Sequence, residues 1–319
     1  MLAATVARFA PDNPLDGLEV TDRPAPEERE HWTTVEVRAA SLNHHDLWSL
    51  RGVGLREEQL PMILGTDAAG VAPDGSEVVL HGVVGADGHG VGPRERRTLL
   101  SEKYPGTLAE QVSVPTANLV PKPAELSFAE AACLPTAWLT AYRMLFRAAD
   151  LRPGDRVLVQ GVGGGVATAA IVLGAAAGLE VTATSRDAAK RDRALELGAS
   201  AVVEPGERVP ARVDAVVESV GQATWAHSVR SVRPGGTIVV CGATSGDAPA
   251  AELSRIFFTE LRVQGVTMGS REDLAALLRF CARTGVRPVV DSEVALADVG
   301  TGLARLAAGE QTGKIVVTP

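Results

Sequence analysis

Four glycines within five positions constrain the fold of this chain more than any other feature of its sequence. They lie in QGVGGGVATAA, residues 160–170. An apolar run at 155–161 precedes them, and small residues suited to a helix follow at 165–178. A strand, a glycine-rich turn and a helix in this order are typical of a parallel sheet that binds a phosphate-bearing ligand at its edge. The alternative is a glycine turn that only connects the strand to the helix.

Strands and helices alternate on through the middle of the chain. Short, continuous apolar runs of this kind suit parallel strands that are covered on both faces. The predicted strands are 155–161, 180–185, 200–204, 214–221, 236–242 and 261–267, and the predicted helices between them are 165–178, 187–198 and 223–232. This pattern predicts a doubly wound α/β domain of the Rossmann type, with the bounds 123–264.

The remaining parts of the chain have a different texture. Residues 1–122 contain short strands separated by Pro and Gly, which predicts a compact, mostly β, partly open barrel. The tail contains an amphipathic helix at 271–284 and a last strand at 313–318. Because a single strand needs a partner sheet, we expect this strand to rejoin the barrel. The second domain then comprises 1–122 and 265–319.

Charge and composition exclude several classes of protein. The formal net charge of -8 argues against nucleic acid as a partner, because binding to phosphate backbones needs a concentrated positive field. No apolar run is long enough to span a membrane, and the N-terminus lacks the pattern of a secretion signal, so we expect a cytoplasmic protein. Cys133, Cys241 and Cys281 are far apart, which argues against disulfides and a structural zinc site.

The glycine run is the predicted seat of a cofactor diphosphate. Gly163, Gly164 and Gly165 allow the backbone to approach the diphosphate, and the helix that is expected to begin near Val166 directs free N–H groups and its positive dipole end toward the anion. The strict G-x-G-x-x-G pattern is not met, because Val162 stands where the first glycine belongs.

The end of the second strand predicts which nicotinamide cofactor binds. An acidic residue there would bind a free ribose 2′-hydroxyl, whereas a 2′-phosphate requires cations and hydroxyls. Ser185 and Arg186 stand at this end, with Lys190 in the next helix, and Asp187 fits a helix N-cap. We therefore predict NADPH rather than NADH. The alternative is that Arg186 and Lys190 only solvate a helix face.

Several stretches together resemble the medium-chain dehydrogenase/reductase superfamily, in particular its zinc-free quinone oxidoreductase-like branch. They are SLNHHDLWSLRG (41–52), PMILGTDAAGVA (61–72), GTLAEQVSVPTANLVPKP (106–123), AACLPTAWLTAYRML (131–145), RPGDRVLVQGVGGGVATAA (152–170), RPGGTIVVCG (233–242) and GKIVV (313–317). The resemblance implies a GroES-like, mostly β catalytic domain beside the Rossmann domain. It also implies a homodimer whose sheet is extended through the sixth strand, 261–267.

The resemblance argues against a catalytic zinc ion. Zinc-dependent relatives carry a cysteine where this chain has Asn43, a Gly-His-Glu where it has Gly65, Thr66 and Asp67, and a further ligand at the position of Thr136. Catalytic zinc normally needs three ligands of the Cys, His or Glu type. His44 and His45 do not replace them, because neighbours in an extended chain point in opposite directions.

A zinc-free relative of this kind would transfer hydride from NADPH to an activated acceptor, such as a C=C bond conjugated to a carbonyl or a quinone. Orientation of donor and acceptor would supply much of the rate, and pre-aimed donors would stabilise the enolate oxygen. Two alternatives remain open: a metal-free oxidoreductase of carbonyls or alcohols, and an NADPH-binding or sensing protein without catalytic activity.

The resemblance assigns roles to individual residues. Asn43 would bond the nicotinamide ribose or the substrate oxygen, or would merely hold a turn. Asp46 would act as an acid or orient His45 or a water, and Tyr104 or solvent would supply the proton. Trp48 and Leu50 would line the substrate pocket. The further cofactor-binding positions implied by the resemblance are Thr140, Val220, Gly221, Gly242, Ala243, Met268, Gly269 and Lys314, the last of which could instead only solvate the final strand.

Overall fold

The computed structural model describes residues 1–85 and 97–319, which form two compact units. Unit 1 comprises Met1–Thr136 and Ser270–Pro319, and unit 2 comprises Ala137–Gly269. Within residues 1–85 and 97–319, no helix is both long and apolar enough to cross a membrane.

Unit 1 is built mainly of antiparallel strands. Its larger sheet has the order β10-β6-β5-β3-β18-β17, and β9 also pairs with β3; smaller sheets have the orders β2-β1-β4 and β7-β8. The bounds of these strands are β1 Leu2–Val6, β2 Leu18–Asp22, β3 Trp32–Ser41, β4 Met62–Ile63, β5 Asp67–Val71, β6 Glu77–Leu80, β7 Val83–Gly85, β8 Arg97–Leu99, β9 Gln111–Pro115, β10 Leu119–Pro121, β17 Val290–Ala295 and β18 Lys314–Thr318.

Strands and helices of unit 1 together form its main apolar core. The core is lined by Val35 and Val37 of β3, by Leu47 and Leu50, and by the C-terminal Ile315 among others. The helices are α1 His44–Leu50, α2 Phe128–Ala132, α8 Arg271–Thr284 and α9 Val299–Ala308. The predicted helix at 271–284 is therefore confirmed.

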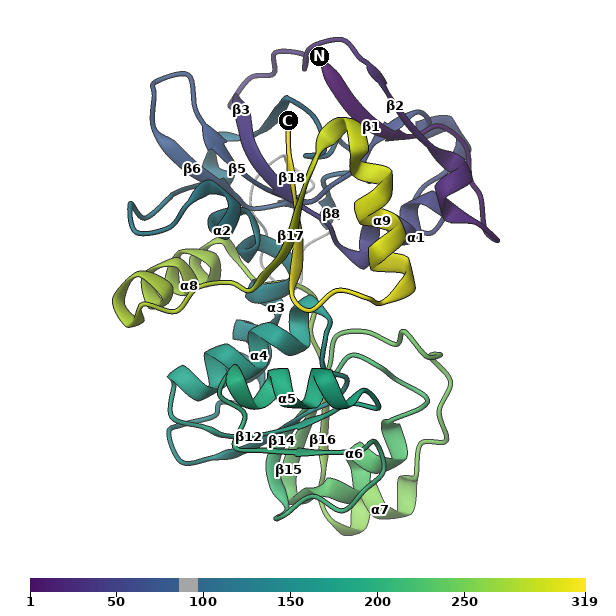
Figure 1. Ribbon diagram of the computed structural model, residues 1–319, viewed down its shortest axis with the longest axis vertical. Coiled ribbons are helices and arrows are strands. Elements are labelled where there is room, and N and C mark those ends of the chain that lie inside the picture. Colours follow the sequence, from purple (N-terminus) through teal and green to yellow (C-terminus); the bar gives the residue numbers. More distant parts are fainter. Residues whose placement is uncertain (86–96) are drawn as a thin grey trace. The chain divides into compact units, whose positions relative to one another are not determined.

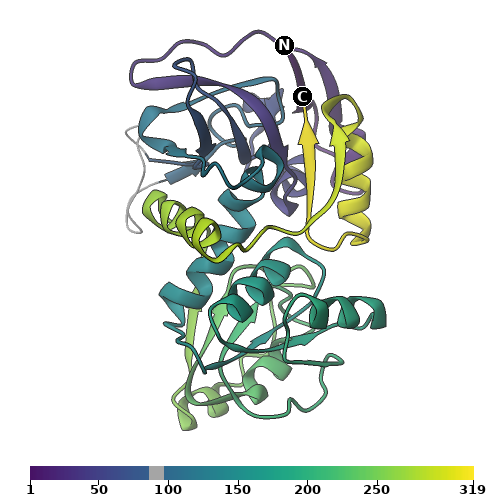
Figure 2. The ribbon, with the colours of Figure 1, turned by 60° about the vertical axis from the view of Figure 1, so that its left-hand side comes forward.

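The last strand of the chain closes unit 1, as predicted. β18 runs antiparallel to β3, with Val316 opposite Ser41, and parallel to β17. Figures 1 and 2 both show β18 lying between β17 and β3. This pairing brings Lys314, at the first position of β18, toward the end of β3 from which the chain enters α1.

The predicted domain bounds differ from the observed units at residues 123–136 and 265–269. The first of these segments contains α2, which contacts β3 and β5 of unit 1. Ser41 of β3 donates a hydrogen bond from its Oγ to the Ala132 carbonyl over 2.9 Å. Because this bond and the buried face of α2 hold the segment on the β sheet, it packs in unit 1.

Unit 2 is a parallel sheet with the order β13-β12-β11-β14-β15-β16. Its strands are β11 Arg156–Val159, β12 Glu180–Thr184, β13 Ala201–Val203, β14 Val213–Glu218, β15 Val232–Val240 and β16 Arg262–Gly265. This order reverses between β11 and β14, the point where doubly wound sheets bind their ligands. The predicted Rossmann architecture is confirmed.

Helices cover both faces of this sheet. α4 and α5 lie over one face, and α6 and α7 lie toward the other (Figure 1). The helices are α3 Leu139–Arg143, α4 Gly165–Ala176, α5 Ala188–Glu196, α6 Trp225–Ser231 and α7 Leu253–Phe258. The sequence analysis did not predict α7, whose residues Leu253, Phe257 and Phe258 are exposed and so show no amphipathic pattern.

Candidate functional site

The glycine run forms the loop between β11 and α4 in unit 2. Gly161 and Gly163 have φ angles of +76° and +122°, which favour glycine over other residues. A Cβ atom on Gly161 would lie 2.7 Å from the Val220 side chain, so the loops after β11 and β14 are in close contact. A Cβ atom on Gly164 would meet no atom within 4 Å. The N-terminus of α4, which begins at Gly165, therefore opens onto free space.

Hydrogen bonds join this loop to the end of β12. The Gly161 N–H donates to Thr184 Oγ1 over 3.1 Å, and the Val162 N–H donates to the Thr184 carbonyl over 2.9 Å. Ser185 and Arg186 follow directly, the first buried and the second exposed. The structure thus brings the glycine run together with the residues predicted to select the cofactor.

Asp187 is bound to the backbone, as its predicted role as an N-cap requires. Its Oδ1 accepts the N–H of Ala189 over 2.8 Å and that of Lys190 over 3.3 Å. Arg191, which was not predicted, donates from its Nη1 to the Ser185 carbonyl over 2.7 Å, and its Nη2 lies 3.2 Å from Glu204. Arg191 fixes the backbone at the end of β12 and adds a cation there.

The other predicted cofactor positions of unit 2 share one edge of the sheet. Val220 and Gly221 follow β14, Gly242 and Ala243 follow β15, and Met268 and Gly269 come after β16, so that all lie beyond the carboxyl ends of parallel strands. Thr140 is buried in α3. Clustering at this edge is the arrangement that doubly wound sheets use for ligands.

A buried carboxylate that the sequence analysis missed shapes the loop after β14. Glu218, fully buried at the end of that strand, accepts the N–H groups of Val220 and Gly221 over 2.9 and 3.0 Å. The hydroxyls of Thr224 and Ser228 also donate to it. An acidic residue at the end of the apolar run DAVVE is the signal that would have identified it.

A second polar cluster lies in unit 1 around Lys314, which is buried. Its Nζ donates to the Leu42 carbonyl over 2.5 Å and to Asn43 Oδ1 over 2.6 Å, and it lies 3.2 Å from Asp67 Oδ2. Asp67 is fully buried, and its Oδ2 also accepts the Ser41 hydroxyl over 2.8 Å. We call Ser41, Asn43, Asp67 and Lys314 the polar centre of unit 1.

The polar centre occupies most of the hydrogen-bonding capacity of Asn43. The Nδ2 group donates to Asp67 Oδ2 over 2.8 Å and to Thr66 Oγ1 over 3.3 Å, while Oδ1 accepts from Lys314. Thr66 Oγ1 in turn lies 3.0 Å from Thr136 Oγ1. Hydrogen bonds thus link five positions that the resemblance singled out, either as site residues or as places where relatives carry zinc ligands. They are Asn43, Thr66, Asp67, Thr136 and Lys314.

Asp46 holds the backbone next to this centre. It is fully buried, and its two oxygens accept the N–H groups of Asn43 over 2.8 Å and of Gly65 over 3.0 Å. Burial raises the pKa of Asp46, against the lowering effects of the neighbouring His45 and of the hydrogen bond from Asn43. Because both oxygens face backbone donors, this geometry favours a positioning role over the predicted role as an acid.

Two predicted site residues lie elsewhere in unit 1. The Tyr104 ring packs against Trp32 with the centroids 4.7 Å apart, and Trp32 begins β3 whereas Asn43 follows its end. Leu50 is completely buried in the apolar core and so does not line a pocket. Trp48, by contrast, is 39% exposed. Tyr104 and Leu50 therefore do not belong to the site around Asn43.

An extended segment was predicted for His44 and His45, but both residues lie in the first turn of α1. Asn43 and Asp46 form the capping box that starts this helix. His44 is exposed, while His45 Nε2 lies 3.3 Å from Glu102 Oε1. Burial lowers the pKa of His45, but the hydrogen bond to Glu102 and the charge of Asp46 outweigh it and raise the pKa above its ordinary value.

The residues of the polar centre, together with Thr66 and Thr136 next to it, do not fit a catalytic zinc ion. Zinc prefers thiolate and imidazole ligands, with carboxylate in support, whereas Asn43, Thr66 and Thr136 offer neutral oxygens and nitrogen. The ammonium of Lys314 already bonds the one carboxylate. Over residues 1–85 and 97–319, no group of three or more His, Cys, Asp or Glu side chains is placed to hold a metal ion.

Sequence and structure comparisons now identify relatives. Residues 29–124 match the family model of the alcohol dehydrogenase GroES-like domain, and residues 161–283 match that of zinc-binding dehydrogenases. A zinc-type alcohol dehydrogenase-like protein of Schizosaccharomyces pombe is 30% identical, covering 81% of this chain and 82% of its own length. A crotonyl-CoA carboxylase/reductase of Cereibacter sphaeroides is 28% identical, covering 83% and 75%.

A solved structure agrees with these matches over the whole chain. The crystal structure of an NAD-dependent alcohol dehydrogenase has a TM-score of 0.90 and 32% sequence identity, and covers 100% of both chains. The GroES-like unit, the Rossmann unit and their order along the chain are thus common to this protein and its relatives. The chain belongs to the medium-chain dehydrogenase/reductase superfamily.

Proposed function

We propose that this protein is an NADPH-dependent reductase that transfers hydride to a C=C bond conjugated to a carbonyl group, as in an enoyl thioester or an enone. The observation that carries the proposal is the junction between the glycine loop and the end of β12. There Gly161 bonds Thr184, and Ser185, Arg186 and Lys190 follow. Hydroxyl and cationic side chains at this point suit a ribose 2′-phosphate.

The proposed cofactor fits the residues of unit 2. The open N-terminus of α4 at Gly164 and Gly165 would receive the diphosphate, since its free N–H groups and the helix dipole favour an anion. Ser185, Arg186 and Lys190 would bind the 2′-phosphate, and Val220, Gly221, Gly242 and Ala243 would flank the nicotinamide half. When bound, NADPH supplies the hydride.

The polar centre of unit 1 supports an acceptor that needs no metal. A conjugated C=C bond accepts hydride readily when donor and acceptor are held in a near-attack geometry. Asn43 is held on three sides by Asp67, Thr66 and Lys314, so its side chain is fixed before a substrate binds. We assign the α-carbon proton to solvent, because Asp46 is fully buried and the Tyr104 ring packs on Trp32.

A substrate panel tests this function. We expect NADPH oxidation with crotonyl-CoA and small enones, little with aldehydes or with alcohols and NADP⁺, and no change after EDTA treatment. The relatedness to a crotonyl-CoA carboxylase/reductase motivates the thioester. Gly164→Val is the matched control: its backbone angles of -69° and 156° suit valine and its Cβ meets no atom, so it should fold normally and yet block the cofactor.

Three outcomes would contradict the proposal in distinguishable ways. Loss of turnover on chelation would indicate a metal enzyme. Turnover of alcohols alone would favour a dehydrogenase such as the solved NAD-dependent relative. NADPH binding that Gly164→Val abolishes, without turnover of any acceptor including quinones, would identify a cofactor-binding or sensing protein.

We also propose a homodimer formed through β16. Among the residues that the structure describes, this strand pairs only with β15, so its other edge has no strand partner there. Val263 of this strand is 48% exposed, and Phe257 and Phe258 of α7 are 61% and 79% exposed. A large exposed apolar patch next to a free strand edge is typical of an interface between subunits.

The double substitution Phe258→Glu/Val263→Lys is expected to convert the dimer to a monomer, because it places charges in the apolar patch. Light scattering after size-exclusion chromatography measures the mass. Leu195→Glu is the control, since Leu195 is an exposed leucine on α5, away from β16. A monomeric wild-type protein, or a double variant that stays dimeric, would rule out this interface.

A further inference from the structure

A pocket rich in arginine lies at the edge of the unit 2 sheet opposite the cofactor residues. It has a volume of about 360 Å³, within the range of small-molecule sites. Arg212 directly precedes β14 and Ser231 directly precedes β15, so the pocket lies at the amino ends of these strands. Val220 and Gly242, in contrast, follow the carboxyl ends. The end of the pocket at Arg212 and Ser231 is therefore distinct from the proposed cofactor site, whereas His227 in its wall bonds Gln160 beside the glycine loop.

The charge of this pocket is not balanced by the protein. Four arginines line it, Arg208, Arg212, Arg230 and Arg255, against a single acidic residue. That residue, Glu207, directs its Oε2 to the N–H of Glu204 over 2.8 Å, which closes a turn. Four guanidinium groups against one carboxylate produce a local positive field on a chain whose net charge is -8.

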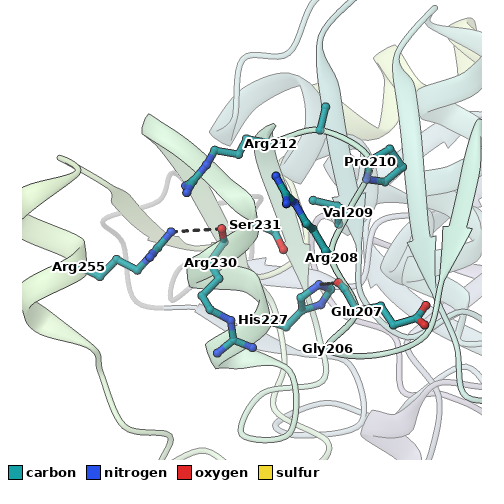
Figure 3. Close-up of a pocket in the computed structure, with 11 residues that line it drawn as sticks. Gly206, Glu207, Arg208, Val209, Pro210, Arg212, His227, Arg230, Ser231 and Arg255 are labelled. Atoms are coloured by element: carbon teal, nitrogen blue, oxygen red, sulfur yellow. Dashed lines mark hydrogen bonds between the residues drawn. The ribbon is translucent and has the colours of Figure 1, made fainter.

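Two of the four arginines are fixed by backbone carbonyls. Arg255 Nε donates to the Val229 carbonyl over 3.0 Å, and Arg212 Nη1 donates to the Val232 carbonyl over 3.2 Å. Each guanidinium has five N–H donors, so most remain available. In the part of the chain that the structure describes, the Arg208 side chain has no hydrogen-bond or ion-pair partner. Figure 3 shows Arg208, Arg212 and Arg255 coming from different segments around one hollow.

His227 fixes the wall of the pocket. Its Nε2 lies 2.8 Å from the Glu207 carbonyl and its Nδ1 lies 3.1 Å from the Gln160 amide nitrogen (Figure 3 draws the first of these bonds). Gln160 Oε1 accepts from Thr184, so its amide nitrogen is the end that faces His227. The ring is then neutral, with Nδ1 accepting and Nε2–H donating. The bond from Nε2–H to the Glu207 carbonyl holds the loop that carries Arg208 against α6.

We propose that this pocket binds a small multiply charged anion of the phosphate class, either a diphosphate or a phosphate ester. The bidentate guanidinium fork matches phosphate oxygens, and two of the forks are already held in place. A nucleic-acid backbone is disfavoured by the overall negative charge of the chain. The proposal does not depend on the enzymatic function proposed above.

Calorimetric titration tests the site after the cofactor site has been saturated with NADPH. If NADPH does not bind, the Gly164→Val variant is titrated instead. Inorganic pyrophosphate and ribose 5-phosphate are the two probes, and they distinguish a diphosphate site from an ester site. We expect binding that weakens with salt and falls at least about tenfold in Arg208→Ala/Arg212→Ala, since a hydrogen bond to a charged group is worth roughly a factor of ten. Arg208→Ala alone, which removes no bond within the protein, should show a smaller loss.

The control removes two arginines that do not line this pocket. Arg279→Ala/Arg283→Ala takes two exposed guanidinium groups from α8 and makes the same change in net charge. It should leave both titrations unchanged. Absence of heat with either probe, or equal weakening in the control, would overturn the proposal and leave the arginines as solvated side chains and caps of α6.

Discussion

Replacing Lys314 by methionine is expected to lower the free energy of unfolding by about 3–5 kcal/mol, the usual cost of removing one partner from a buried ion pair. The ammonium that methionine removes gives hydrogen bonds to Leu42 and Asn43 and pairs with Asp67, which is fully buried. The Asp67 carboxylate would keep only the neutral donors Ser41 and Asn43. Urea denaturation followed by circular dichroism measures the change.

A second substitution separates the ion pair from simple loss of packing. In Asp67→Asn/Lys314→Met both charges are gone, so most of the lost stability should return, because no uncompensated charge stays buried. Lys103→Met, on an exposed lysine of the same unit, should be nearly neutral. A double variant as unstable as the sum of the two single variants would show that the pair is not coupled.

The same substitution has a consequence for the proposed reaction. Lys314 holds Asn43 Oδ1, and Asp67 holds Asn43 Nδ2, so the two charges together fix both ends of the amide. Without Lys314 the amide can rotate. The sequence alone suggested that Lys314 contacts the cofactor or substrate, or only solvates β18; its burial and its three partners make it a positioning residue instead.

Local patterns were sufficient to predict most of the fold. The strand pattern between 155 and 267 identified the parallel sheet, because continuous apolar runs mark strands covered on both faces. The final strand was predicted to pair with the sheet of the first unit, because a single strand is not stable without a partner. α1 was missed because Asn43 and Asp46 were read for chemistry, although their spacing is also a capping box.

The candidate site was less predictable, because its bonds join residues that are distant in the sequence. Lys314 and Asp67 are 247 positions apart, and neither segment indicates the other. Tyr104 was expected to supply the proton, but its ring packs against Trp32, a residue 72 positions earlier in the sequence. Asp46 also binds the Gly65 N–H, 19 positions away, and no local pattern links these two segments.

The largest expected change in ligand affinity comes from substitutions at and just after the end of β12. In Arg186→Ala/Lys190→Ala, NADPH affinity should fall at least about 100-fold, since each cation that bonds a phosphate contributes roughly 1.5–3 kcal/mol. NADH affinity should change little, because NADH lacks the 2′-phosphate. Fluorescence titration of the bound nicotinamide measures both dissociation constants on the same preparations.

Two controls decide what such a loss means. Arg193→Ala removes an exposed cation that already pairs with Glu196 on the same helix, so a general field effect would weaken NADPH in this variant too. Equal weakening of NADPH and NADH in the double variant would show that Arg186 and Lys190 only solvate α5. Asp187 Oδ1 caps the helix through the N–H groups of Ala189 and Lys190. The preference for NADPH therefore rests on the cations Arg186 and Lys190.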